Sequence, residues 1–225
     1  MPVSFPAAEL TDFMAAARAV LLTPTKSIGW SELAGASNLI GWRFRAANEY
    51  WQAYKSSWTN CGPNVDFEEI YERERNLYGM FSSGVSSIEC TAYSIAALLS
   101  HPSVLGMAFG QAEQRACSPK KLAQWVSGQA ATQSLKSALD SVVNAPEWKC
   151  WVDLRNRMTH RSNLPRVVQG AVGNAPPPAK AIHFAATSST DDIEGELDDF
   201  DELHTWLADT VRLLLREGRA VAAGP

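Results

Sequence analysis

The chain has 225 residues, of which 46% are hydrophobic and 20% are charged, and its formal net charge is -4. This length suits one domain with appendages, and the composition excludes an intrinsically disordered chain. A pI near 5.6 argues against broad non-specific affinity for nucleic acid but leaves room for a local basic cleft.

Periodic apolar residues predict two helices in the N-terminal quarter. The first covers about residues 10–21 and ends at Thr23-Pro24, and the second covers about 37–58. No apolar run approaches the ~20 residues of a transmembrane helix, and no signal-peptide pattern precedes the first helix. We therefore expect a cytoplasmic protein with no membrane partner.

A long third helix is predicted from residue 67 to about residue 99. Asp66 followed by Glu69 has the form of a capping box. Gly79 and Gly84 weaken the middle of this helix, so a bend is possible there. Its predicted apolar face consists of Phe67, Ile70, Tyr71, Tyr78, Phe81, Val85, Ile88, Ala92, Ile95 and Leu99.

Shorter helices are predicted in the middle of the chain. Ser118-Pro119 suits an N-cap followed by a first-turn proline, and helices are expected at 119–127, 131–144 and 146–162. After residue 164 the composition changes to two β-prone runs around a Gly/Pro-rich connector, which predicts a hairpin or an extended arm.

The last helix carries an apolar stripe from Phe200 to Leu215. Together these elements predict an all-α protein, a helical bundle with a small β-prone hairpin insertion before its last helix. We expect an N-terminal helix and linker at 1–36, a bundle at 37–217 that includes the β-prone insertion at about 165–190, and a flexible tail at 218–225.

The chemistry of the chain is concentrated in the sequence LRNRMTHR. On a helix, Asn156 and His160 share one face, and the long side chain of Arg155 reaches the same patch. Arginine binds phosphate oxygens through bidentate hydrogen bonds, and histidine titrates near neutral pH. These are groups that can cleave RNA without a metal. The basic surface is extended by Arg157, Arg161 and Arg166.

A simpler interpretation is a cationic turn near a helix C-terminus, where the helix dipole favours Arg and His. However, Arg155 is followed by the polar residue Asn156, and four residues, 156–159, separate it from His160. This pattern resembles the signature of the HEPN superfamily (higher eukaryotes and prokaryotes nucleotide-binding). In that family an Arg and a polar residue precede a His on a late helix of a bundle. The resemblance covers about residues 37–217.

The resemblance implies a metal-independent endoribonuclease that cleaves RNA by 2′-OH attack and acts as a toxin or phage-defence effector. It also implies a homodimer, with an antitoxin or a nucleotidyltransferase as a further partner and RNA as substrate. In this family an acidic residue on an earlier helix often meets the Arg–His pair. The candidate is Glu89, which follows Ser82 and Ser86 and precedes Tyr93 in a polar row. A solvated glutamate on a helix edge is the alternative for Glu89.

Other residues give weaker signals. His101, His183 and His204 lie at no metal-ligand spacing, and the four scattered cysteines form no Cys-x-x-Cys pair, so we predict no metal, no cofactor and reduced structural thiols. The Trp and Tyr residues of the second helix suit a core better than a platform for stacked bases. Two alternatives to the ribonuclease stay open: a non-catalytic HEPN-like protein that binds nucleotides or a partner, and a plain helical scaffold.

Overall fold

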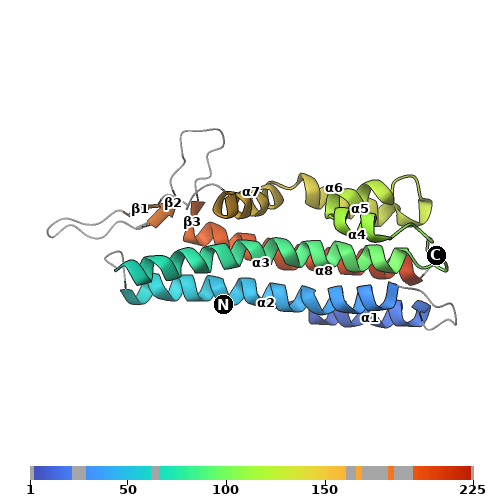
Figure 1. The fold of residues 1–225 in the computed structure, drawn as a ribbon, viewed down its shortest axis with the longest axis horizontal. Coiled ribbons are helices and arrows are strands. Elements are labelled where there is room, and N and C mark those ends of the chain that lie inside the picture. The colour runs from blue at the N-terminus through green and yellow to red at the C-terminus, as the bar shows by residue number, and fades with distance from the viewer. Residues whose placement is uncertain are drawn as a thin grey trace.

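The computed structural model describes residues 3–21, 29–61, 66–160, 166–168, 182–184 and 195–223. Helices dominate these residues (Figure 1). The elements are α1 (Ala7–Leu21), α2 (Gly29–Cys61), α3 (Phe67–Leu99), α4 (Gln111–Ala116), α5 (Pro119–Trp125), a 3-10 turn (Ala130–Thr132), α6 (Gln133–Asn144), α7 (Pro146–His160), β1 (Arg166–Val168), β2 (Ile182–Phe184), β3 (Gly195–Glu196) and α8 (Leu197–Ala223).

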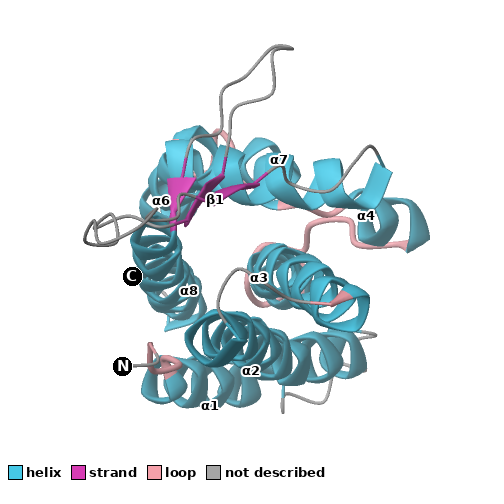
Figure 2. Ribbon diagram, turned by 90° about the vertical axis from the view of Figure 1, so that its left-hand side faces the viewer, coloured by secondary structure: helices cyan, strands magenta, loops and turns pink. Residues whose placement is uncertain are grey.

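Two long helices, α2 and α3, run side by side along the length of the molecule. Seen from one end, α1 and α2 lie on one side of α3, and α4, α6 and α7 lie on the other (Figure 2). The last helix, α8, packs against α1, α3 and α6. This arrangement places α7, which carries residues 154–160 of the motif, directly against α3, which carries Glu89.

The helix starts follow local side-chain chemistry. Asp66 accepts a hydrogen bond from the backbone N–H of Glu69 at 3.0 Å, which confirms the predicted N-cap of α3. Ser118 accepts one from the N–H of Lys121 at 3.2 Å, with Pro119 in the first turn of α5. The Glu69 carboxylate does not close a capping box, because it accepts a hydrogen bond from Ser57 on α2.

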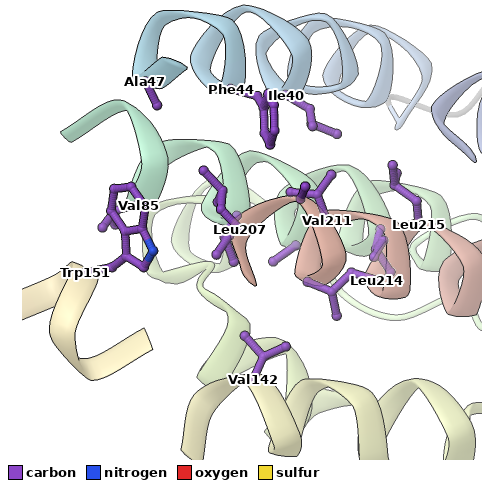
Figure 3. Packing of buried hydrophobic residues seen from close by; sticks show 14 of the residues in the cluster. Ile40, Phe44, Ala47, Val85, Val142, Trp151, Leu207, Val211, Leu214 and Leu215 are labelled. Atoms are coloured by element: carbon purple, nitrogen blue, oxygen red, sulfur yellow. The ribbon is translucent and has the colours of Figure 1, made fainter. Parts of the chain in front are cut away.

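The core forms where α2, α3, α6, α7 and α8 meet. Figure 3 shows side chains from all five helices converging, with Phe44 from α2 and Trp151 from α7 the largest among those labelled. Trp151 is fully buried, and its Nε1 donates a hydrogen bond to the Leu203 carbonyl of α8 at 3.3 Å. Because Trp151 also packs against Phe81 of α3, it joins three helices at one point.

The two glycines in the middle of α3 serve close packing, and α3 continues through both of them. A Cβ at Gly79 would lie 2.6 Å from the ring of Tyr50, and a Cβ at Gly84 would lie 2.7 Å from Cη2 of Trp151. Glycine is therefore required at these positions so that α2 and α7 can approach α3.

The predicted apolar face of α3 is wrong over its first three turns. Phe67, Ile70, Tyr71 and Tyr78 are exposed, whereas Arg73, Asn76 and Leu77 are buried. The buried guanidinium of Arg73 lies 3.8 Å from the centre of the Trp58 ring and donates to Ser57 of α2. In this part of α3 the neighbour is α2, so the buried side turns towards α2.

The described residues show an all-α protein with very little strand, so the predicted all-α fold class is correct. Within the β-prone insertion, β1 pairs with β2 in antiparallel fashion, and β2 pairs with β3. The residues between these strands lie outside the described part of the chain. Residue 36 falls inside α2, and Phe13 and Ala17 of α1 are fully buried in the core, so α1 is packed as part of the bundle. None of the described helices is long and apolar enough to cross a lipid bilayer.

Candidate functional site

The motif helix α7 begins at Pro146 with Glu147 in its first turn, as expected for a helix N-terminus. Trp151 and Leu154 are fully buried and set the rotation of the helix about its axis. That rotation leaves Arg155 and Asn156 half-buried, with Arg155 directed into the bundle. The position of Arg155 thus follows from the packing of its apolar neighbours.

Arg155 lies close enough to Glu89 of α3 for the two charges to interact. The Nε atom of Arg155 is buried and has no hydrogen-bond partner within the described residues. A buried guanidinium donor without a partner is costly, and such groups are often held for a ligand or an ion. The structure therefore brings together the arginine and the acidic residue that the sequence singled out.

Glu89 is half-buried, so the alternative of a solvated glutamate on a helix edge does not describe it. Burial raises the pKa of its carboxyl group, and the positive charge of Arg155 opposes that rise. A carboxyl group with a raised pKa beside a cation can hold or release a proton at a higher pH than a free glutamate.

The predicted polar row on α3 lines the same region. The Oγ of Ser82 is buried without a hydrogen-bond partner within the described residues, and the Tyr93 hydroxyl donates to Glu32 of α2 at 2.7 Å. Burial raises the pKa of Tyr93, and the negative charge of Glu32 raises it further. Ser82 and Tyr93 are thus neutral groups on either side of Glu89 along the helix.

The charge of Glu89 also acts on two cysteines, Cys90 and Cys117, and no motif in the sequence indicated this. Burial raises the pKa of the Cys117 thiol to about 12, with a further contribution from the charge of Glu89. Burial likewise raises the pKa of Cys90, and a hydrogen bond with Ser86 and the positive charge of Arg43 partly oppose that rise. Both thiols therefore stay protonated near neutral pH and are poor nucleophiles.

The remaining motif residues are described to different extents. Arg157 is half-buried, and the Thr159 hydroxyl donates back to the Arg155 carbonyl at 2.7 Å within the helix. The backbone of α7 is described up to His160, but the side chain of His160 is not. The predicted RNA contacts of Arg161 and Arg166 also lie outside the described residues, except for the backbone of Arg166 in β1.

The other histidines have structural surroundings. His101 is buried, and its Nδ1 accepts a hydrogen bond from the N–H of Ser103 at 3.2 Å. His204 is buried between the rings of Trp51 and Trp151, and its Nδ1 donates to the Phe200 carbonyl at 2.8 Å. No group of three His, Cys, Asp or Glu side chains in the described ranges could hold a metal ion.

A small cavity of about 150 Å³ lies beside His204, between α2 and α8. Asp201 borders it and accepts hydrogen bonds from Trp51 at 2.5 Å and from Lys55 at 2.7 Å. This volume is below that of typical ligand pockets, which hold about 300 Å³ or more. We interpret the cavity as part of the packing between α2 and α8.

A scan against models of protein families, a search of curated proteins and a search of solved structures found no match to this chain.

Proposed function

We propose that this protein is a metal-independent endoribonuclease of the HEPN type, acting as a toxin or phage-defence effector. The observation that carries the proposal is the burial of Arg155 Nε, which has no hydrogen-bond partner within the described residues, together with the electrostatic interaction between Arg155 of α7 and Glu89 of α3. The complete Arg155–Asn156–His160 set on α7 supports it.

In this mechanism Arg155 binds the scissile phosphate and stabilises the charge of the phosphorane, and Asn156 positions the phosphate. The ribose 2′-oxygen attacks phosphorus as its proton leaves, and the bond from phosphorus to the 5′-oxygen breaks as that oxygen gains a proton. His160 carries one of these proton transfers. Glu89 orients Arg155, and the basic side chains of Arg157, Arg161 and Arg166 bind the RNA backbone.

Two proton transfers on opposite sides of the phosphate call for two acid–base groups. One chain offers a single histidine in LRNRMTHR, so the proposal includes a homodimer in which a second copy supplies its own His160. An antitoxin or a nucleotidyltransferase would be the partner that controls the enzyme.

The experiment measures RNA cleavage by the purified protein in EDTA. Wild-type protein is expected to cut, and His160→Ala and Arg155→Ala are expected to lose activity by at least about a hundredfold. Arg45→Ala is the matched control, because Arg45 is an exposed arginine of α2 that pairs with Glu49 at 2.6 Å. Cleavage by His160→Ala at the wild-type rate would exclude the proposed site. Binding of RNA without cleavage would favour the non-catalytic alternative.

A further inference from the structure

The middle of α3 is accessible to solvent along one side only. Between residues 80 and 99 its side chains are buried except for five that are half-buried, namely Ser82, Ser86, Glu89, Cys90 and Tyr93. These are the polar row and the neighbouring cysteine, and at about 100° per residue they share one side of the helix. Because Glu89 interacts with Arg155, this accessible side continues the candidate site.

Arg43 of α2 lies on the edge of that helix that faces the polar row. Glu32, Arg43 and Tyr50 fall within about 20° of one another around α2. Glu32 accepts a hydrogen bond from the Tyr93 hydroxyl at 2.7 Å. The ring of Tyr50 lies against Gly79, where a Cβ would be 2.6 Å from it. Arg43 comes between these two contacts along α2, so its side chain lies beside α3.

The register of the two helices sets the level of Arg43. The helices α2 and α3 run in opposite directions (Figure 1), and Ser87 Oγ of α3 donates to the Ile40 carbonyl of α2 at 3.2 Å. Arg43 follows Ile40 by three residues, so it lies level with about residue 84 of α3, within one turn of Ser86. The charge of Arg43 acts on the thiol of Cys90, which agrees with this position.

No ion pair neutralises the charge of Arg43 within the described residues, and its side chain is exposed. In contrast, Arg45 on the same helix pairs with Glu49 at 2.6 Å. Glu32 is about 16 Å from Arg43 along α2, which is beyond the range of unscreened interactions in physiological salt. Burial raises the pKa of Glu89, which lowers its negative charge at a given pH, and Arg155 lies beside it. Arg43 is therefore a cation that is free to bind an anion.

We propose that Arg43 binds a second phosphate of the RNA, so that the strand crosses the polar row of α3 between Arg155 and Arg43. The helices α7 and α2 lie on opposite sides of α3, so the two arginines approach the row from opposite sides (Figure 2). About the width of one helix, ~10 Å, separates them, and a nucleic-acid strand spans this distance within a few phosphates. Ser82 lies on this path, and its buried Oγ has no hydrogen-bond partner within the described residues.

This inference rests on the proposed function and adds a contact outside the LRNRMTHR helix. A contact between arginine and phosphate positions the strand and carries no base information, so it should act equally on all sequences. Each such contact with a single strand changes the slope of log Kd against log salt by about 0.7. At ~0.15 M salt, loss of one contact therefore raises the Kd about fourfold.

The test measures binding of a fluorescein-labelled 2′-O-methyl oligonucleotide of about 12 nucleotides to the full chain by fluorescence anisotropy at several salt concentrations. The methyl group blocks attack by the 2′-oxygen, so binding is measured without cleavage. Arg43→Ala should raise the Kd about fourfold at ~0.15 M salt and lower the salt slope by about 0.7. Arg43→Lys keeps the charge and should keep the slope. Arg45→Ala is the matched control and should bind like wild type.

Both arginines are exposed and contribute little to folding, and circular dichroism checks that each variant is folded. An Arg43→Ala protein with the wild-type Kd and salt slope would overturn the proposal, as would an equal loss in Arg45→Ala. Absence of binding by the wild-type protein would overturn it too.

Cleavage of unmodified RNA, measured in parallel, separates this inference from the proposed function. Cleavage by a wild-type protein whose binding does not depend on Arg43 would leave the ribonuclease and overturn the contact. Binding that depends on Arg43 without any cleavage would overturn the ribonuclease and support the contact.

Discussion

Gly84→Ala is expected to destabilise the protein through Trp151. Gly84 lies where α7 packs against α3, and an added Cβ would lie 2.9 Å from Cε3 and 2.7 Å from Cη2 of the Trp151 ring. The ring has no free side to move into, because it is fully buried, contacts Phe81 and His204, and is hydrogen-bonded to the Leu203 carbonyl.

The change in the free energy of unfolding caused by Gly84→Ala is the balance of two effects. Overpacking a filled core costs about 1–3 kcal/mol, and the fixed ring puts this site near the upper end. Replacing glycine by alanine in a helix gains up to about 1 kcal/mol in helix propensity. The net loss in the free energy of unfolding is therefore about 2 kcal/mol, which lowers Tm by about 4–8 °C for a chain of this length.

Chemical denaturation of Gly84→Ala and Gly35→Ala measures the difference directly. Gly35 is an exposed position of α2 where a Cβ would meet nothing within 4 Å, so Gly35→Ala should stabilise the protein by about 0.5–1 kcal/mol. The two substitutions share the same change in the unfolded chain, so their difference reports the packing of Trp151. A Gly84→Ala protein as stable as Gly35→Ala would show that α7 is not held against α3 in this way.

Glu89→Gln should reduce RNA cleavage by at least about tenfold, because Arg155 would lose the charge that orients it. Glu49→Gln, on the surface of α2, is the control and should cleave like wild type. Wild-type activity in Glu89→Gln would leave Glu89 without a role in the site. Because the pKa of Glu89 is raised in the folded protein, Glu89 contributes to the free energy of unfolding below its unfolded pKa near 4.5, and this contribution is lost as pH rises through the folded pKa. Glu89→Gln should therefore make the free energy of unfolding, measured by denaturation, less dependent on pH in that range. Burial lowers the pKa of His204, and hydrogen bonds to the carbonyls of Phe200 and Ala47 oppose that change. His204 therefore contributes to the free energy of unfolding above pH 6.5, and this contribution is lost as pH falls through the folded pKa. The slope of stability with pH in that range should be smaller in His204→Gln, and an unchanged slope would contradict the assignment.

Features set by neighbouring residues were predictable from the sequence. The N-caps at Asp66 and Ser118 depend on a side chain and a backbone group three residues apart, and both were found where expected. The boundaries of the short helices at 119–125 and 133–144 follow the same kind of local signal. The all-α class follows from the sum of such signals.

Features set by distant helices were not predictable. The periodicity of α3 shows that Phe67 and Tyr78 share a face, but only the fold shows that this face is exposed. The close packing of Gly84 against Trp151 was not predictable, because Trp151 is remote in the sequence. Glu89 was identified through the family resemblance, and its burial beside Arg155 and Cys117 required the fold.

The chemical nature of the RNA ends is the sharpest test of metal-independent cleavage through His160. RNA incubated with the protein in EDTA is analysed by mass spectrometry, with His160→Ala as the comparison. Wild-type protein is expected to leave fragments with 2′,3′-cyclic phosphate ends, because attack by the 2′-oxygen leaves the phosphate bound to both oxygens of the same ribose. His160→Ala is expected to leave the RNA intact. Fragments that instead carry 5′-phosphate and free 3′-hydroxyl ends, or the same cyclic ends at the same yield from His160→Ala, would contradict this mechanism.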